Sequence, residues 1–225
     1  MIQEADGIIA LGKFSPKTIQ DLESYSKPLI FVDSNTLYLG HSCVTTDLED
    51  SVITALEHFL EHGHKEIGLL VGQEETADAT PLQMDPRQRV FQQFLTEKEL
   101  YEERFVAVGQ FSTESGYQMM EQLIQALGDD LPTAFFMASD AIAVGALRSL
   151  QEHQIAVPDR VSLISFNDTS IAKYVFPALS TVTVYTEEMG KQAIQMLRQA
   201  FQGSQPSVPC MVKLATKLTI RDSSR

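Results

Sequence analysis

Eight polar and aromatic side chains that could bind a small polar ligand occur at or just after the ends of apolar runs. They are Asp33, Arg87, Phe111, Ser139, Asp140, Phe166, Asn167 and Asp168. The carboxylates, the guanidinium group and the amide can donate and accept paired hydrogen bonds, which suits the vicinal hydroxyl groups of a sugar. The phenyl rings can cover the apolar C–H face of the same molecule. These residue types therefore favour a saccharide-binding site.

Each of these residues also has a purely structural interpretation. An Asp or Asn at the start of a helix often caps it, and capping is the stronger interpretation of any one of them taken singly. Phe111 and Phe166 can equally well be core residues. Polar clusters nevertheless recur at the same end of successive apolar runs. In open α/β sheets ligands bind at the carboxyl ends of strands, so the recurrence favours a ligand site.

No pattern typical of catalysis accompanies these residues. The sequences G-x-S-x-G, G-x-x-x-x-G-K-[ST] and G-x-G-x-x-G are absent. His64 and His153 lie beside predicted helix ends, and the sequence pairs neither of them with a nucleophilic Ser or Cys. We therefore expect a binding protein, with no catalytic residue and no cofactor.

Residues 58–62 spell H-x-x-E-H, a pattern found in zinc peptidases. Two histidines four residues apart could share a metal ion. At 100° per residue, however, His58 and His62 lie about 200° and 240° round the helix from Leu56, on the face opposite the predicted core. A zinc ion there would sit in solvent, so we expect no metal site.

Alternating strands and helices must position the candidate residues. Strands are predicted at 7–11, 28–32, 66–71, 105–108, 133–138, 160–166, 180–184 and 210–214, and amphipathic helices at 15–25, 47–62, 86–98, 112–127, 140–153 and 186–202. In the second of these helices Asp47 can cap the first turn and Gly63 can end the last one. Val52, Leu56 and Phe59 share one face of it. This order predicts an α/β fold, with a parallel sheet covered by helices on both faces.

The formal charge of −13 over 225 residues limits the partners of this chain. An acidic surface repels phosphate backbones, so we expect no direct contact with DNA or with an anionic membrane. The apolar runs are also far shorter than a membrane span. Cys43 and Cys210 are far apart and lack metal-ligand spacing, which indicates free thiols in a reducing cytoplasm.

Three segments resemble the LacI/GalR repressor family. They are GHKEIGLLVG (63–72), PTAFFMASDAIAVGALRSLQEHQIAVPDRVSLISFNDTSIAKYVFPALSTV (132–182) and MGKQAIQMLRQAF (189–201). The resemblance extends over nearly the whole chain. Within it, SLISFNDTSIAKYVFPALSTV is most similar to the galactose- and lactose-responsive branch of Gram-positive bacteria.

The resemblance implies a periplasmic-binding-protein-like core, in which two Rossmann-like lobes hold a sugar effector. The lobes would be residues 1–44 with 184–211, and residues 45–183 with 212–225. Family members usually have a further strand, helix, strand and helix before the strand that starts here near Asp6, so we expect the N-terminal lobe to be incomplete. A homodimer is also implied, with operator DNA bound only through a helix-turn-helix domain ahead of the core.

Carried over residue by residue, the resemblance assigns roles to several candidates. Asp33 and Arg87 match the family's effector carboxylate and arginine, and Phe111 matches an aromatic residue that stacks on the sugar. Ser139 matches an amide ligand and Asn167 a second carboxylate. Many relatives have Asn in place of Ser139 and Asp in place of Asn167, so this pocket keeps fewer charges and need not bind the same sugar.

The segment 171–176 predicts a dimer interface, because it is dense in large apolar residues that a short helix cannot all bury. The resemblance places this segment and the helix around 142–152 at a self-complementary two-fold contact. The expected interface residues are Ile142, Leu147, Ile171, Tyr174, Val175 and Phe176. Inward packing of Tyr174 and Phe176 is the alternative.

These expectations together describe the sugar-sensing and dimerising core of a transcriptional repressor for galactose or galactoside utilisation, located in the cytoplasm. A sugar-binding protein of a transport system with the same fold is one alternative. An enzyme acting on a bound sugar or nucleotide is another, but no acid–base pair is evident for it.

Overall fold

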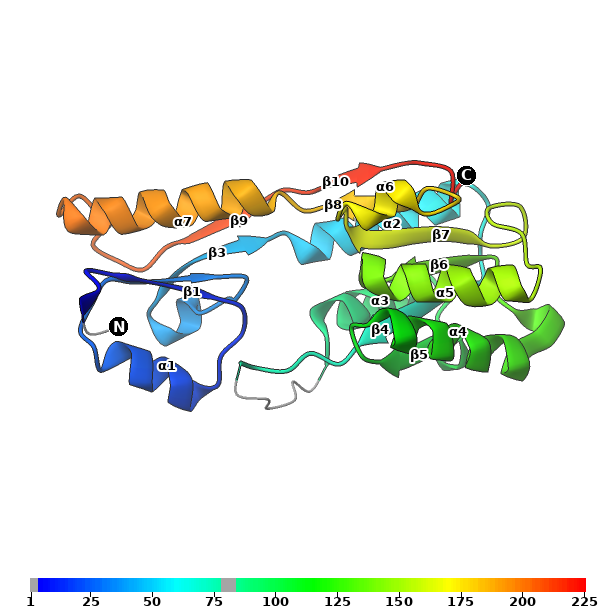
Figure 1. Ribbon diagram of the computed structural model, residues 1–225, viewed down its shortest axis with the longest axis horizontal. Helices are drawn as coiled ribbons and strands as arrows, with labels where there is room; N and C mark the ends of the chain where they lie inside the picture. The colour runs from blue at the N-terminus through cyan, green and yellow to red at the C-terminus, as the bar shows by residue number, and fades with distance from the viewer. Residues whose placement is uncertain (1–3, 78–83) are drawn as a thin grey trace. The chain divides into compact units, whose positions relative to one another are not determined.

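Two separate β-sheets organise the chain, which the computed structural model describes over residues 4–77 and 84–225 (Figure 1). Each sheet belongs to its own structural unit. The first unit takes its described residues from Met1–Asp47, Glu75–Leu82 and Tyr185–Ala215, and the second from Leu48–Glu74, Gln83–Val184 and Thr216–Arg225.

The first unit is built on a four-stranded sheet of order β1-β2-β3-β9, in which all neighbours are parallel. Its elements are β1 (Ile8–Leu11), α1 (Pro16–Glu23), β2 (Leu29–Val32), the 3₁₀ helix η2 (Leu37–Leu39), β3 (Ser42–Thr46), α7 (Thr186–Phe201) and β9 (Met211–Leu214). α1 begins where Ser15 accepts a hydrogen bond from the Thr18 amide and Pro16 supplies a preset backbone angle. Its Ile19 packs on Phe31 and Cys43 of the sheet.

The second unit is built on a six-stranded sheet of order β10-β8-β7-β6-β4-β5, parallel except for β10. Its strands are β4 (Ile67–Gly72), β5 (Val106–Gly109), β6 (Ala134–Met137), β7 (Ser162–Asn167), β8 (Ser180–Thr183) and β10 (Lys217–Thr219). Its helices are α2 (Leu48–Glu61), α3 (Pro86–Glu97), α4 (Thr113–Leu127), α5 (Asp140–Glu152) and α6 (Ile171–Tyr174), with 3₁₀ turns η3 (Glu103–Phe105) and η4 (Gly128–Asp130). No helix in the described part of the chain is long and apolar enough to cross a membrane.

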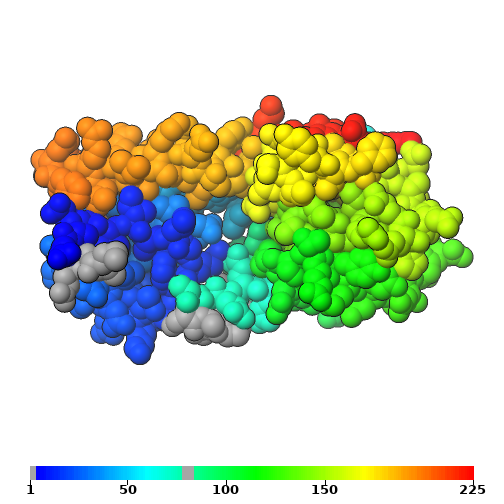
Figure 2. All heavy atoms as spheres, viewed as in Figure 1, coloured from blue at the N-terminus to red at the C-terminus, as the bar shows by residue number. Residues whose placement is uncertain are grey.

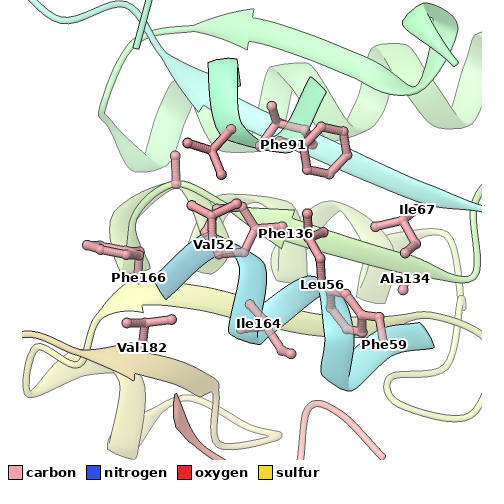
Figure 3. Packing of buried hydrophobic residues seen from close by; sticks show 14 of the residues in the cluster. Val52, Leu56, Phe59, Ile67, Phe91, Ala134, Phe136, Ile164, Phe166 and Val182 are labelled. Carbon is pink, nitrogen blue, oxygen red and sulfur yellow. The ribbon is translucent and has the colours of Figure 1, made fainter. Parts of the chain in front are cut away.

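Helices cover both faces of the second sheet, as the strand–helix alternation predicted. α2 and α3 pack on one face, and α4 and α5 pack on the other. On the first face Val52, Leu56 and Phe59 of α2 point together toward the sheet (Figure 3). They meet Phe136 of β6 and Ile164 of β7 there, so the face that the sequence predicted for α2 is the buried one.

Sequence patterning missed two strands. β3 (Ser42–Thr46) has the sequence SCVTT, and β10 (Lys217–Thr219) has the sequence KLT. Both are short and largely polar, so neither has an apolar run of its own. They are strands because neighbours pair with them: β3 lies between β2 and β9, and β10 pairs with β8.

Three of the points at which the chain passes between the units lie just after β3, β8 and β9. These crossing points lie a few residues beyond the lobe limits expected from the sequence. The described residues 75–77 also group with the first unit, although they lie inside the range expected for the second. One contact that places them is the hydrogen bond from the Ala77 amide to the Lys13 carbonyl, over 2.8 Å.

Two glycines let α4 and α5 pack closely side by side (Figure 1). A Cβ atom on Gly116 of α4 would lie 2.2 Å from the Ile142 carbonyl oxygen, and one on Gly145 of α5 would lie 1.9 Å from the Thr113 carbonyl oxygen. These are backbone contacts that cannot yield to a larger residue. The close packing holds the first turn of α5, where Ser139 and Asp140 lie.

Candidate functional site

Arg87 lies in the first turn of α3 and is only 7% exposed. Asp85 caps this helix, since its Oδ1 accepts a hydrogen bond from the Arg87 amide over 2.8 Å, and Pro86 follows as the first helical residue. The same carboxylate binds the Arg87 side chain at both of its oxygens. Nε donates to Oδ1 over 2.8 Å, and Nη2 donates to Oδ2 over 2.6 Å. Asp85 therefore starts the helix and orients its arginine.

Four further groups from other parts of the second unit surround the Arg87 guanidinium group. Nη1 donates to the Ala138 carbonyl over 2.8 Å, and Nη2 donates to Glu74 Oε1 over 3.0 Å. The guanidinium carbon lies 4.8 Å from the centroid of the Phe111 ring and 5.4 Å from that of Phe166. Arg87, Phe111 and Phe166, which the sequence analysis selected separately, thus meet at the carboxyl edge of the second sheet.

Phe111 and Phe166 differ in their exposure. Phe166 is buried and packs edge-on against Phe136, with ring centroids 6.4 Å apart, as the core interpretation predicts. Phe111 is half-buried and lies against Gly72, where a Cβ atom would come within 2.4 Å of the ring. Of the two rings, Phe111 keeps surface that a ligand could cover.

Ser139 and Asp140 begin α5 and are both buried. Ser139 caps the helix by accepting from the Ile142 amide over 3.2 Å. Oδ1 of Asp140 accepts from the hydroxyls of Ser165 (2.5 Å) and Thr181 (3.0 Å). Its Oδ2 accepts from the amide and hydroxyl of Thr169, over 2.6 and 2.7 Å. The Asp140 carboxylate therefore ties α5 to β7, to β8 and to the loop after β7.

Asn167 and Asp168 end β7 with two successive residues at positive φ, 109° and 58°. Non-glycine residues rarely adopt this region, and such positions are common at ligand sites. Asp168 Oδ1 accepts from Arg221 Nη2 over 2.6 Å, and its Oδ2 accepts from the Thr183 hydroxyl over 2.9 Å. The Asn167 side chain is half-buried and, within residues 4–77 and 84–225, makes no hydrogen bond. Its amide is therefore available to a ligand.

Asp33 belongs to the first unit, directly after β2. It also has positive φ (64°), and its amide donates to the Val44 carbonyl over 3.0 Å. Its carboxylate is about half exposed and lies 3.7 Å from the Lys13 ammonium group. The seven other candidates all belong to the second unit.

Glu74 and Asp85, the two carboxylates that contact Arg87, were not among the site residues predicted from the sequence. The signal for Asp85 was present, because Asp-Pro before an amphipathic stretch is typical of a helix N-terminus. Glu74 follows β4 by two residues, in a segment with several acidic residues. Nothing in the sequence distinguishes it from Glu75.

The expected dimer residues divide into two groups. Ile142 and Leu147 were expected at the interface, but the structure corrects this: both are buried in the core of the second unit, where α5 packs against α4 and the sheet. Tyr174 and Phe176 are 83% and 84% exposed, and Ile171 beside them is 44% exposed. Figure 2 shows this segment, in yellow, on the surface. Inward packing of the two aromatic residues is therefore wrong.

Val175 is the half-buried member of that segment and packs against the core. We define the α6 patch as Ile171, Tyr174 and Phe176, the three exposed apolar residues. The Phe176 carbonyl accepts a hydrogen bond from the Gln151 side chain over 2.6 Å, which joins the patch to the end of α5.

The two histidines of the H-x-x-E-H segment contact each other, with ring centroids 4.2 Å apart. His58 Nε2 lies 3.0 Å from the Arg225 carbonyl oxygen, and His62 Nδ1 lies 2.7 Å from the His58 carbonyl oxygen. Across the described residues, no group of three or more His, Cys, Asp or Glu side chains could hold a metal ion.

A cavity of about 400 Å³ lies in the first unit, lined by residues at the amino ends of its strands, such as Leu29 and Ser42. Its lining also includes the ion pair between His41 and Glu23, with an Nε2–Oε1 distance of 2.8 Å. It includes none of the eight candidate residues. We therefore place the candidate site at the carboxyl edge of the second sheet, where Arg87, Phe111 and Asn167 lie.

Comparison with known proteins identifies the family of this chain. Residues 56–224 match the model of a periplasmic binding protein-like domain. Over 223 residues the chain is 48% identical to the HTH-type transcriptional regulator GalR of Streptococcus thermophilus, covering 99% of this chain and 67% of that protein. The chain belongs to the LacI/GalR family. A second LacI/GalR relative, the HTH-type transcriptional regulator GalR of Lacticaseibacillus casei, is 37% identical over 99% of this chain and 67% of that protein.

LacI/GalR membership confirms the fold class and the family resemblance predicted from the sequence. The solved complex of the transcriptional regulator CelR with cellobiose matches with a TM-score of 0.84 and 25% identity, over 98% of this chain and 66% of that one. The relatives are named as transcriptional regulators, which confirms the expectation that the chain is not an enzyme. The chain spans about two thirds of the length of these relatives.

Proposed function

We propose that this chain is the effector-binding and dimerisation core of a LacI/GalR-type repressor that responds to galactose or a galactoside. The observation that carries the proposal is that Arg87, in contact with Phe111, lies at the same carboxyl edge of the second sheet as Asn167, which ends β7. The similarity to two regulators named GalR supports the choice of sugar. The names of the relatives favour this function over that of a transport protein.

The cluster offers complementary groups to a saccharide. Phe111 presents part of a ring to the C–H face of a pyranose. The Asn167 amide can donate and accept, so it can bind one hydroxyl group or two adjacent ones. Arg87 contributes a guanidinium group that is already oriented by Asp85, which reduces the entropy lost on binding.

The other candidates have different roles in this proposal. Ser139, Asp140 and Asp168 bind other parts of the second unit, so we assign them to the support of the site wall. Phe166 supports Arg87 from within the core. Asp33, which belongs to the first unit, stays a predicted effector ligand.

Regulation would follow from differential binding. An effector that prefers one arrangement of the protein shifts the population toward that arrangement, by an amount equal to the difference in its two affinities. We infer that operator DNA is contacted by a helix-turn-helix segment of a longer protein in the cytoplasm, and that the α6 patch joins two copies of the core.

Calorimetric titration with galactose, lactose, cellobiose and glucose tests the proposal. Asn167→Ala removes a side-chain amide that makes no hydrogen bond within the described residues, so sugar affinity should fall about tenfold, the scale of one hydrogen bond to a ligand. Because Asn167 has a φ of 109°, where alanine is strained, circular dichroism must first establish that the variant is folded. Gln118→Ala, which removes an exposed amide on α4, is the matched control and should bind as the wild type does. If no sugar binds the wild type, or if Asn167→Ala binds with unchanged affinity, the proposed site is wrong.

A further inference from the structure

Two carboxylates surround the one guanidinium group of the candidate site. Asp85 occupies the paired Nε and Nη2 donors of Arg87, and Glu74 accepts a second hydrogen bond from Nη2. The side chains of Asp85, Arg87 and Glu74 are 1%, 8% and 16% exposed. The formal charges are one positive and two negative, so this shielded group of three is anionic overall.

The same carboxylate also blocks a second feature that would attract anions. The first turn of a helix presents free backbone N–H groups and a partial positive charge, which together bind phosphates readily. In α3 the Asp85 carboxylate, which caps the helix, accepts a hydrogen bond from the backbone N–H of Arg87. Asp85 thus occupies both the fork of the arginine and part of the helix N-terminus.

We propose that Asp85 and Glu74 make the site selective for uncharged sugars and against phosphorylated sugars and sugar acids; this inference rests on the proposed function. An unpaired arginine is well suited to bidentate binding of phosphate or carboxylate. Here that geometry is already taken, and an incoming anion meets a net negative charge in surroundings that screen it poorly. A sugar hydroxyl avoids this repulsion, because it carries no charge and can donate a hydrogen bond to a carboxylate oxygen.

The selectivity should depend on the charge of Glu74 more than on its shape. Glu74→Gln removes one negative charge while keeping the size of the side chain and an oxygen that can accept from Arg87. Glu66→Gln is the matched control, because Glu66 is exposed and precedes the opposite end of the same strand, β4. Asp85→Asn provides a second test, since Asn is also a good helix cap.

The experiment measures the affinities of galactose and galactose 6-phosphate for each protein by calorimetry, with circular dichroism to establish that each variant is folded. The wild type and Glu66→Gln should bind the phosphate at least about a hundredfold more weakly than galactose, since juxtaposed like charges strongly oppose binding. In Glu74→Gln the ratio of galactose affinity to galactose 6-phosphate affinity should be about tenfold smaller than in the wild type, because one like charge has been removed. If Glu74→Gln does not fold, the same narrowing is expected for Asp85→Asn.

Three outcomes would overturn the inference. Equal binding of galactose and its phosphate by the wild type would show that the site does not select by charge. An unchanged ratio in folded Glu74→Gln and Asp85→Asn, with galactose binding intact, would remove these residues as the cause while leaving the proposed function standing. If the wild type binds neither galactose nor lactose, the proposed function fails and the inference fails with it.

Discussion

Arg87 and Asp85, two residues apart in sequence, form a bidentate ion pair that is almost completely shielded from water. The pair joins the start of α3 to the residue that follows β6, through the hydrogen bond from Arg87 to the Ala138 carbonyl. A residue that the family resemblance identifies as a ligand contact is therefore also a structural support. Its substitution should change stability as well as binding, and the two effects can be measured separately.

We expect Arg87→Ala to lower the free energy of unfolding by about 3–5 kcal/mol, because it leaves the Asp85 carboxylate buried without its partner. Arg87→Lys keeps the charge but not the bidentate geometry, so its effect should be smaller. Urea unfolding measures both. Arg148→Ala is the control, since Arg148 pairs with Glu152 at the exposed surface of α5 and should change stability by less than about 1 kcal/mol. Equal effects of Arg87→Ala and Arg148→Ala would contradict the structural role.

Asp140→Asn should destabilise the second unit by about 2–4 kcal/mol, because the new NH₂ group would face hydrogen-bond donors that now point at a carboxylate oxygen. Asp130→Asn, at an exposed position in η4, serves as the control. Both are compared in the same denaturation experiment. If Asp140→Asn lowers the free energy of unfolding no more than Asp130→Asn does, the Asp140 hydrogen bonds contribute little to stability.

Self-association through the α6 patch should be lost in Tyr174→Asp and in Phe176→Asp, because each places a charge on an exposed apolar surface. Val175→Asp is a poorer test, since Val175 packs against the core. Sedimentation velocity over a wide range of concentrations should show a dimer for the wild type and a monomer for the two variants. Tyr38→Asp alters an equally exposed tyrosine of the first unit and should remain dimeric. A monomeric wild type, or dimers that survive both changes, would exclude this surface.

The 225-residue chain should not bind operator DNA by itself, because its net charge of −13 opposes approach to a phosphate backbone. A mobility-shift assay at low salt with promoter DNA is the measurement. Adding competitor DNA distinguishes specific from nonspecific complexes. A complex that persists against competitor would show that this core contacts DNA directly.

Stability should fall as the pH is lowered below about 6.5, the usual pKa of histidine. Burial lowers the pKa values of His58 and His64, and the neighbouring charge of His62 lowers both further. For His58, the Arg225 carbonyl and Glu61 act in the opposite direction without cancelling this effect. Between the lowered pKa of the folded state and 6.5, the unfolded chain therefore binds more protons than the folded chain. The contribution of the two histidines to the free energy of unfolding is fully present above pH 6.5 and is lost as the pH falls through this range.

Urea unfolding at pH 8 and at pH 5.5 tests this pH dependence. His64→Gln removes one of the two groups, so the variant should lose less stability over that interval than the wild type does. An equal loss in both proteins would show that His64 does not contribute.

Several residues of the candidate site were predictable from the sequence, because the patterns that predict strands and helices are local. The alternation of strands and helices depends on residues close together in sequence, and it placed Asp33, Phe111 and Asn167 after strands, or at the end of one, as the structure has them. The buried face of α2 follows in the same way from the spacing of Val52, Leu56 and Phe59. Helix caps are equally local, and Ser139 is such a cap.

The sequence by itself determined the fold class, the edge of the sheet where polar side chains gather and the family to which the chain belongs, since each is carried by periodicity or by contiguous segments. The tertiary structure decided which of those side chains remain available. Asp140 is satisfied by residues 25 to 41 positions away, and Arg87 by Glu74, Asp85 and a carbonyl 51 residues away. Hydrogen bonds act over about 3 Å, and only packing brings residues so distant in sequence within that range.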